Sequence, residues 1–120
     1  MIRPAVHLVL HVLFPGVCAR LFFKQNWWKA WAIMVLTLAV DLDHLLSVPI
    51  YDPNRCSINY HPLHSYPAIC VYLVLAAVPR LRIVGLGLLI HMGLDFVDCI
   101  WQAKSGAAFF DGYWFALLVP

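Results

Sequence analysis

The sequence predicts an all-α integral membrane protein, a bundle of four transmembrane helices followed by a short C-terminal hydrophobic helix. Of its 120 residues, 63% are hydrophobic and 12% are charged, whereas a soluble domain is about half apolar and about a quarter charged. A water-soluble fold of this size could not bury so much apolar surface. Spanning segments have to be helical here, because the alternating pattern of a transmembrane barrel is absent. We therefore expect a single transmembrane helical domain over residues 1–120.

Four apolar stretches approach the roughly 20 residues that a helix needs to cross the hydrocarbon core of a bilayer. In chain order they are residues 5–23, 27–50, 66–79 and 83–101. The first is expected to bend at Pro15-Gly16, because proline removes a helical hydrogen bond. The last hydrophobic stretch, residues 107–119, would span as a fifth helix, lie flat on the membrane or pack as a half-helix. Prolines in the one long connection, residues 51–65, predict an irregular loop.

Basic residues predict how the bundle is oriented. Five of the eight Lys and Arg residues belong to the connections after the first and third helices. Because such charge is retained on the cytoplasmic side, the N-terminus and loop 51–65 should face the extracytoplasmic side. Cys56 and Cys99 would both lie near that face, where a disulfide between them is one option. The net charge of +2 provides no basic patch, so we expect no nucleic-acid partner.

Histidines and aspartates recur at helical spacing in the outer halves of three expected helices. These polar stripes are His7 with His11, Asp41 with His44, and His91 with Asp95 and Asp98. Residues at these spacings share one face of a helix, and an ionisable group turned to lipid costs about 3 kcal/mol or more at mid-depth. The stripes should therefore face one another, and His61 and His64 add two imidazoles from the loop.

Imidazole and carboxylate groups on facing helices are the ligands of zinc, manganese or iron in helix bundles. We therefore expect a divalent metal, most simply zinc, near the extracytoplasmic face. Its expected ligands are His7, His11, Asp41, His44, His61, His64, His91 and Asp95. An uncoordinated carboxylate, Asp43 or Asp98, would act as general base in catalysis at this site.

Several of these residues also have a purely structural interpretation. His7 and His11 would otherwise form hydrogen bonds between helices, and Asp98 would pair helices near the interface. Asp43 lies about 200° from Asp41 on an α-helical wheel. It would therefore face a different neighbour, hold an imidazole from outside the ligand shell of the metal, or mark local unwinding of the helix.

The sequence resembles small bacterial inner-membrane proteins of the YdjM type in three segments: Asp41-Leu42-Asp43-His44, His61-Pro62-Leu63-His64-Ser65 and His91-Met92-Gly93-Leu94-Asp95. Those proteins are regarded as metal-dependent hydrolases. Their loop motif has the form His-Arg-Gly-x-Thr-His-Ser, whereas the motif here is shorter and lacks the arginine. Segments 3–7 and 52–56 resemble an uncharacterised bacterial membrane family of about this length. The resemblance implies a multi-pass protein of the inner membrane that hydrolyses a lipid or lipid-linked ester or phosphoester at the extracytoplasmic side.

Two other functions fit the same residues. The histidine pairs at 7 and 11 and at 61 and 64 resemble the histidine boxes of membrane di-iron oxidases, although those enzymes use more than the six histidines found here. A non-enzymatic membrane subunit that binds metal or haem, or that conducts metal ions or protons, is the third hypothesis. Membrane lipids are partners in all three, and association with further copies of the chain is left open.

Overall fold

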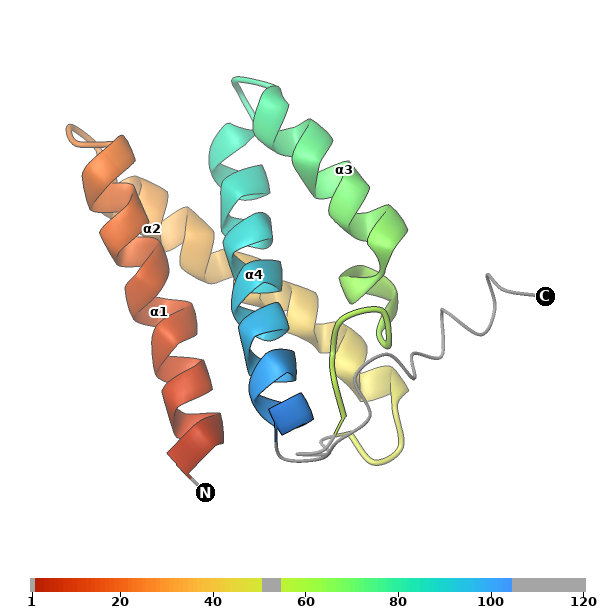
Figure 1. Ribbon diagram of the computed structural model, residues 1–120. Helices are drawn as coiled ribbons and strands as arrows, with labels where there is room; N and C mark the ends of the chain where they lie inside the picture. Colours follow the sequence, from red (N-terminus) through yellow and green to blue (C-terminus); the bar gives the residue numbers. More distant parts are fainter. Residues whose placement is uncertain (1, 51–54, 105–120) are drawn as a thin grey trace.

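A computed structural model describes residues 2–50 and 55–104 of the chain. The regular structure in these ranges is entirely helical, as expected, with α4 in contact with α1, α2 and α3 (Figure 1). The predicted helix at 107–119 lies outside the described residues. The elements are α1 (Ile2–Phe22), α2 (Trp27–Leu36), η1 (Thr37–Leu46), η2 (Pro62–His64), α3 (Tyr66–Ala77) and α4 (Arg82–Lys104), where η denotes a 3-10 helix.

Two of these helices are long and apolar enough to cross a membrane. They are the segments Ile2–Phe22 and Arg82–Gln102, each of 21 residues, with mean hydropathies of 1.7 and 1.8. Their positions agree with the predicted stretches 5–23 and 83–101, and α1 continues through Pro15. The third apolar helix, α3, has 12 residues.

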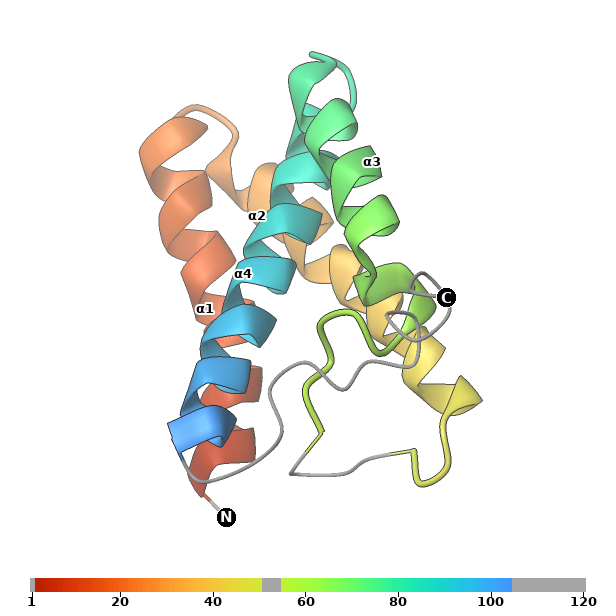
Figure 2. The ribbon, with the colours of Figure 1, turned by 45° about the vertical axis from the view of Figure 1, so that its right-hand side comes forward.

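The helix connections are divided between the two ends of the molecule. The α1–α2 and α3–α4 turns lie at one end, and the start of α1, the described parts of the connection from η1 to η2 and the C-terminal end of α4 lie at the other (Figures 1 and 2). This division is the one that the sequence predicts for the first and third connections on one side and the N-terminus on the other.

The second predicted helix, residues 27–50, changes its winding in the middle. It is α-helical to Leu36, continues as the 3-10 helix η1 and ends at Leu46. Three residues make one 3-10 turn, so residues three apart share a face. Thr37, Val40 and Asp43 are accordingly the buried residues of η1. The tighter winding places Asp43 about 120° from Asp41, so both carboxylates can reach the same neighbour.

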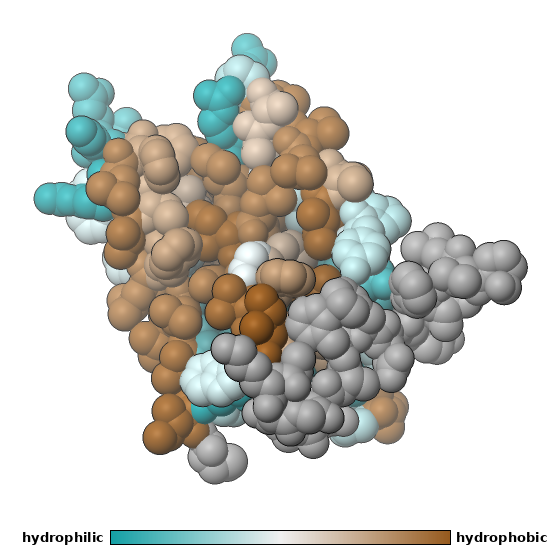
Figure 3. Space-filling view, viewed as in Figure 1, coloured by the Kyte–Doolittle hydropathy of each residue, from teal (hydrophilic) through white to brown (hydrophobic). Residues whose placement is uncertain are grey.

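The exterior of the protein is apolar, and much of its interior is polar. Brown, hydrophobic atoms cover the described surface in Figure 3, while teal, hydrophilic atoms gather mainly at the end with the two short turns. Buried ionisable side chains include His11, Asp43, His64, His91 and Asp95. This distribution is the reverse of that in a soluble protein, where such groups are seldom fully buried.

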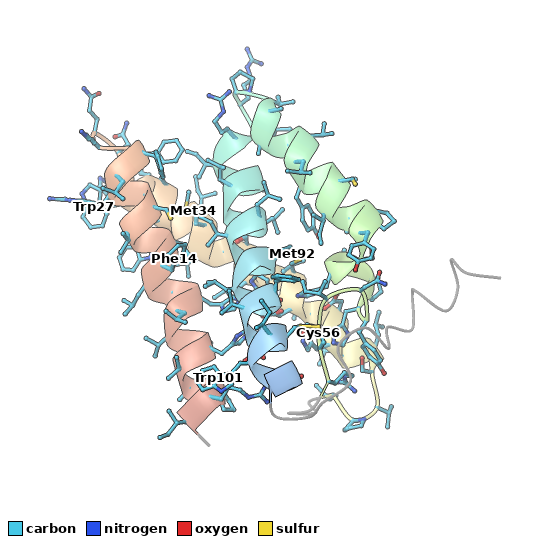
Figure 4. All side chains as sticks on the ribbon, viewed as in Figure 1. Phe14, Trp27, Met34, Cys56, Met92 and Trp101 are labelled. Atoms are coloured by element: carbon cyan, nitrogen blue, oxygen red, sulfur yellow. A yellow bond between two sulfur atoms is a disulfide. The ribbon has the colours of Figure 1, made fainter. Side chains whose placement is uncertain are left out.

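Two small apolar clusters complete the interior. One surrounds Met34 between α1, α2 and α4, and the other surrounds Met92 between α4, η1 and α3 (Figure 4). At the α3–α4 crossing the two backbones approach closely, because a Cβ atom built on Gly85 would overlap the backbone of Ala76. These contacts fix α4, which carries two of the predicted metal ligands.

Candidate metal centre

Four predicted ligand atoms from three separate elements meet at one point. Asp41 comes from η1, His64 from η2, and His91 and Asp95 from α4, and one ligand atom of each lies within 4.8 Å of the others. The His64 Nε2 atom lies 3.2 Å from Asp41 Oδ1 and 3.0 Å from Asp95 Oδ2. The His91 Nε2 atom lies 3.1 Å and 3.2 Å from the same two oxygens. The two Nε2 atoms are 3.3 Å apart.

These separations fit a tetrahedral metal site. Zinc binds imidazole nitrogen and carboxylate oxygen at about 2.0–2.2 Å, so its ligand atoms lie about 3.3–3.6 Å from one another. The five separations that involve an imidazole nitrogen, 3.0–3.3 Å, are only slightly shorter, and the two carboxylate oxygens lie within 4.8 Å of each other. The ligand atoms are therefore close enough for direct contact with one another, and a small increase in their separations would admit the ion. We refer to Asp41, His64, His91 and Asp95 as the four-ligand group.

Asp43 orients His64 from outside this group. Its Oδ2 atom lies 2.9 Å from His64 Nδ1 and accepts a hydrogen bond of 2.9 Å from the backbone N–H of Leu63. Tyr72 of α3 donates its hydroxyl proton to the Leu63 carbonyl oxygen. A carboxylate on Nδ1 fixes the ring and leaves Nε2 as the ligand atom. The structure therefore agrees with two interpretations of Asp43: it lies where the helix changes its winding, and it holds an imidazole from outside the ligand shell.

The carboxylates of the four-ligand group attract positive charge to its centre. Burial would lower the pKa of His64, but its close contacts with the carboxylates of Asp41, Asp43 and Asp95 outweigh burial and raise this pKa to about 11. In the protein without metal, a proton on His64 therefore neutralises part of the carboxylate charge. Metal binding to histidine displaces such a proton, because the ligand is the unprotonated nitrogen.

A second set of predicted ligands lies on the other side of Asp95. The Nε2 atoms of His7 and His11, both on α1, lie 3.1 Å and 3.2 Å from Asp95 Oδ1. His11 is almost fully buried, and its Nδ1 lies 2.8 Å from the carbonyl oxygen of His7. We refer to His7, His11 and Asp95 as the three-ligand group. The α1 stripe and the α4 stripe therefore face one another, as the sequence predicts.

Two predicted ligands, His44 and His61, lie beside the four-ligand group and not within it, although His44 forms a further possible ligand set with Asp43 and His64. The Nδ1 atom of His44 is 3.1 Å from Asp43 Oδ1, and its ring centroid is 3.9 Å from that of His61. The Nδ1 atom of His61 lies 3.1 Å from the hydroxyl of Ser47. Burial, followed by the nearby charge of His44, lowers the pKa of His61 to about 4, so His61 is neutral near pH 7.

A pocket of about 320 Å³ opens onto both groups of ligands. Asp98, one of the two predicted general bases, lines it and contacts Arg3 and Gln102 at 3.4 Å and 2.8 Å. Asp43, the other, is not among the residues that line it. The predicted residues did not include Gln102 or the serines beside the histidines. Gln102 lies four residues after Asp98 and continues the α4 stripe, so its spacing could have identified it, whereas the serines are isolated polar residues without a recognisable pattern. The described lining comprises Arg3, Pro4, His7, Asp41, His44, Ile50, Arg55, Ser57, His61, Asp95, Asp98 and Gln102.

A disulfide bond joins the pocket wall to α4. It links Cys56, in the connection before η2, to Cys99, one helical turn beyond Asp95. Figure 4 labels Cys56 beside the lower half of α4, at the end of the molecule that holds the metal ligands. The disulfide therefore restrains the loop segment that supplies Arg55 and Ser57 to the pocket.

Comparisons with known proteins place the chain in a family but give no activity. Neither the curated proteins nor the solved structures contain a match to it. A protein-family model matches residues 1–102, which include every residue of the two ligand groups and of the pocket. The family carries the description "family of unknown function". The chain therefore belongs to the DUF6122 family.

Proposed function

We propose that this protein is a multi-pass inner-membrane, metal-dependent hydrolase that acts on a lipid or lipid-linked phosphoester or ester at the extracytoplasmic side. The observation that carries the proposal is the four-ligand group, two of whose members, Asp41 and Asp95, line the pocket. The ligands come from η1, η2 and α4, so their convergence depends on the whole fold and not on one local motif.

The distribution of side chains supports the membrane location. α1 and α4 are long enough to span, and α2 with η1 forms a third continuous helical segment. The 12 residues of α3 extend over about 18 Å, so α3 would cross the membrane only together with its flanking segments. Exposed leucine, valine and phenylalanine side chains on α1, α3 and α4 would face lipid, and the ionisable groups are turned away from it. We propose four spans on this basis.

The disulfide supports the proposed orientation independently of the basic residues. Disulfides persist in the bacterial periplasm and are rare in the cytosol. Cys56–Cys99 lies at the end of the molecule opposite the basic α1–α2 and α3–α4 turns (Figure 4). The distribution of basic residues and the disulfide therefore both favour an extracytoplasmic metal centre.

Cysteine labelling of intact bacterial cells tests the orientation. With Cys18 and Cys70 replaced by serine, we expect Ile2→Cys to react with a membrane-impermeant maleimide and Gln25→Cys to be protected until the cells are broken. Both positions are exposed, at opposite ends of the bundle, so each variant is the control for the other. The reverse labelling pattern would place the site in the cytoplasm.

A divalent ion in the four-ligand group would polarise a scissile ester and lower the pKa of a bound water toward 7. The chain supplies the remaining functions from the pocket wall. Arg3 and Arg55 line the pocket and provide positive charge for an anionic head group. His44, held by Asp43 and facing the pocket, is placed to move a proton to or from the reacting oxygen. We assign Asp43 a positioning role, and Asp98 is the second pocket carboxylate available as a base.

The alternative functions are less well supported by the arrangement. The imidazole nitrogens of His64 and His91 are 3.3 Å apart, which leaves no room for a haem between them. The di-iron oxidase hypothesis needs the second histidine pair as ligands, but His61 contacts Ser47 and lies outside the ligand groups of the described residues. The carboxylate-rich ligand set is compatible with zinc or manganese hydrolysis.

Two histidine variants test the metal and the chemistry separately. Purified His91→Ala should lose metal in elemental analysis and lose turnover of bis(p-nitrophenyl) phosphate and of long-chain p-nitrophenyl esters in micelles. His44→Ala should retain its metal but lose about 10²–10⁴-fold in turnover, because a proton-transfer group contributes that much. Full metal content in His91→Ala would contradict the assigned ligands, and stoichiometric iron with oxygen-dependent turnover would contradict hydrolysis.

A further inference from the structure

We infer that the centre is binuclear, with a second divalent ion bound by the three-ligand group and bridged to the first ion through the carboxylate of Asp95. The inference rests on the proposed function, because it adds an ion to the same site. It also narrows the substrate class to phosphoesters.

Asp95 divides its two oxygens between two pairs of imidazoles. Its Oδ2 atom faces His64 and His91 at 3.0 Å and 3.2 Å. Its Oδ1 atom faces His7 and His11 at 3.1 Å and 3.2 Å. All four contacts are made by Nε2 atoms. A carboxylate that offers one oxygen to each of two ligand sets has the geometry of a bridge between ions, which lie about 3.5–4 Å apart in two-metal enzymes.

His11 provides an independent indication that an ion belongs in the three-ligand group. The hydrogen bond from Nδ1 to the His7 carbonyl oxygen fixes the proton on Nδ1. The Nε2 atom is buried and lies close to Asp95 Oδ1, yet it makes no hydrogen bond with any described residue. Asp95 Oδ2 is likewise buried without a hydrogen bond. Buried polar atoms seldom remain unpaired, and atoms that are close but not aligned suit ligands directed at a common third point.

The two oxygens of Asp95 and the imidazoles beside them favour two ions over one. One ion in the four-ligand group would use Oδ2 and leave Oδ1 beside two imidazoles inside a segment that we propose to span the membrane. An ion in the three-ligand group would bind these imidazoles and link α1 to α4. The spacing of His7 and His11 by one helical turn suits this role, because both rings reach the same point from α1.

The two groups differ in how open they are to substrate. An ion in the four-ligand group would take a water or substrate oxygen as a fifth ligand, whereas the three-ligand group leaves a tetrahedral position open, as catalytic sites do. His7 is 30% exposed and lines the pocket, so the open position faces the substrate. Paired ions stabilise the attacking and leaving oxygens of a phosphoryl group, and Arg3 and Arg55 line the same pocket. These features together favour a phosphoester.

Metal counting on the full-length protein in detergent tests the inference. After removal of metal with a chelator and reloading with Mn²⁺, we expect two ions per chain in the unsubstituted protein and one in His7→Ala and His11→Ala. The control is His61→Gln, a buried histidine in neither ligand group, which should keep both ions. Electron paramagnetic resonance should show exchange-coupled Mn²⁺ in the unsubstituted protein and an isolated ion in the two alanine variants.

The outcomes separate this inference from the proposed function. One Mn²⁺ per chain, unchanged in His11→Ala and lost in His91→Ala, would overturn the second ion and leave the first in place. No bound Mn²⁺, Zn²⁺ or Fe²⁺ in the unsubstituted protein would overturn both. If His11→Ala does not fold, His7→Ala, at a partly exposed position, and the spectrum of the unsubstituted protein still decide the number of ions.

Discussion

Asp95→Asn is expected to remove bound metal from the purified protein, with a loss of affinity greater than about 100-fold. Replacing groups that merely orient metal ligands costs about 10–100-fold, and Asp95 contacts all four imidazoles of the two ligand groups directly. Asparagine keeps the shape of the side chain but loses its charge and one oxygen. Elemental analysis and titration calorimetry with Zn²⁺ would measure the loss.

Asp98→Asn is the matched control for this substitution. Asp98 lies one turn further along α4, and its Oδ2 atom contacts Arg3 and Gln102. It belongs to no possible ligand group of the described residues. We expect Asp98→Asn to retain metal while changing turnover. An equal loss of metal in both variants would show that the end of α4 is generally sensitive to loss of charge, and would remove the special role of Asp95.

Gly85→Ala is expected to destabilise the bundle by about 3 kcal/mol or more, the upper end of what overpacking costs. The new methyl group would overlap the backbone of Ala76 in α3, and a backbone cannot turn aside as a flexible side chain can. α3 would have to move away from α4 and take with it the Tyr72 hydrogen bond to Leu63, next to His64. Thermal unfolding in detergent would report the loss of stability, and metal content the displacement of His64.

Gly93→Ala provides the comparison on the same helix. A Cβ atom at Gly93 meets nothing within 4 Å among the described residues, so alanine should be tolerated or slightly stabilising. A similar loss of stability in both variants would mean that glycine in α4 is needed for some reason other than the close crossing with α3.

The sequence was sufficient to predict the long helices and the inward-facing polar stripes. α1 and α4 follow from uninterrupted apolar stretches, because a segment in lipid has to satisfy its backbone internally. The pairing of His7 with His11 and of His91 with Asp95 follows from spacing along a helix, which is a local property. Because these ionisable residues lie within apolar segments, the sequence also indicates that the stripes face one another and not the lipid.

Other features depended on contacts between distant segments. The 3-10 winding of η1 brings Asp41 and Asp43 to neighbouring faces, and no local residue pattern in 37–46 distinguishes it from an α-helix. His61 and His64 are three residues apart in the same loop, yet only His64 joins a ligand group. The contacts of Asp43 and Leu63 decide this, and they come from η1 and from the packing of η2 on α3.

The sequence by itself therefore determined that this chain is helical, that its exterior is apolar and that histidine and aspartate gather toward one end. The tertiary structure decided which nitrogen and oxygen atoms converge, and it separated ligands from the residues that hold them. The physical reason is that periodicity fixes the face on which a side chain lies but not its distance from another helix. That distance is set by close crossings such as Gly85 on Ala76, and by the position of Asp95 between α1 and η2.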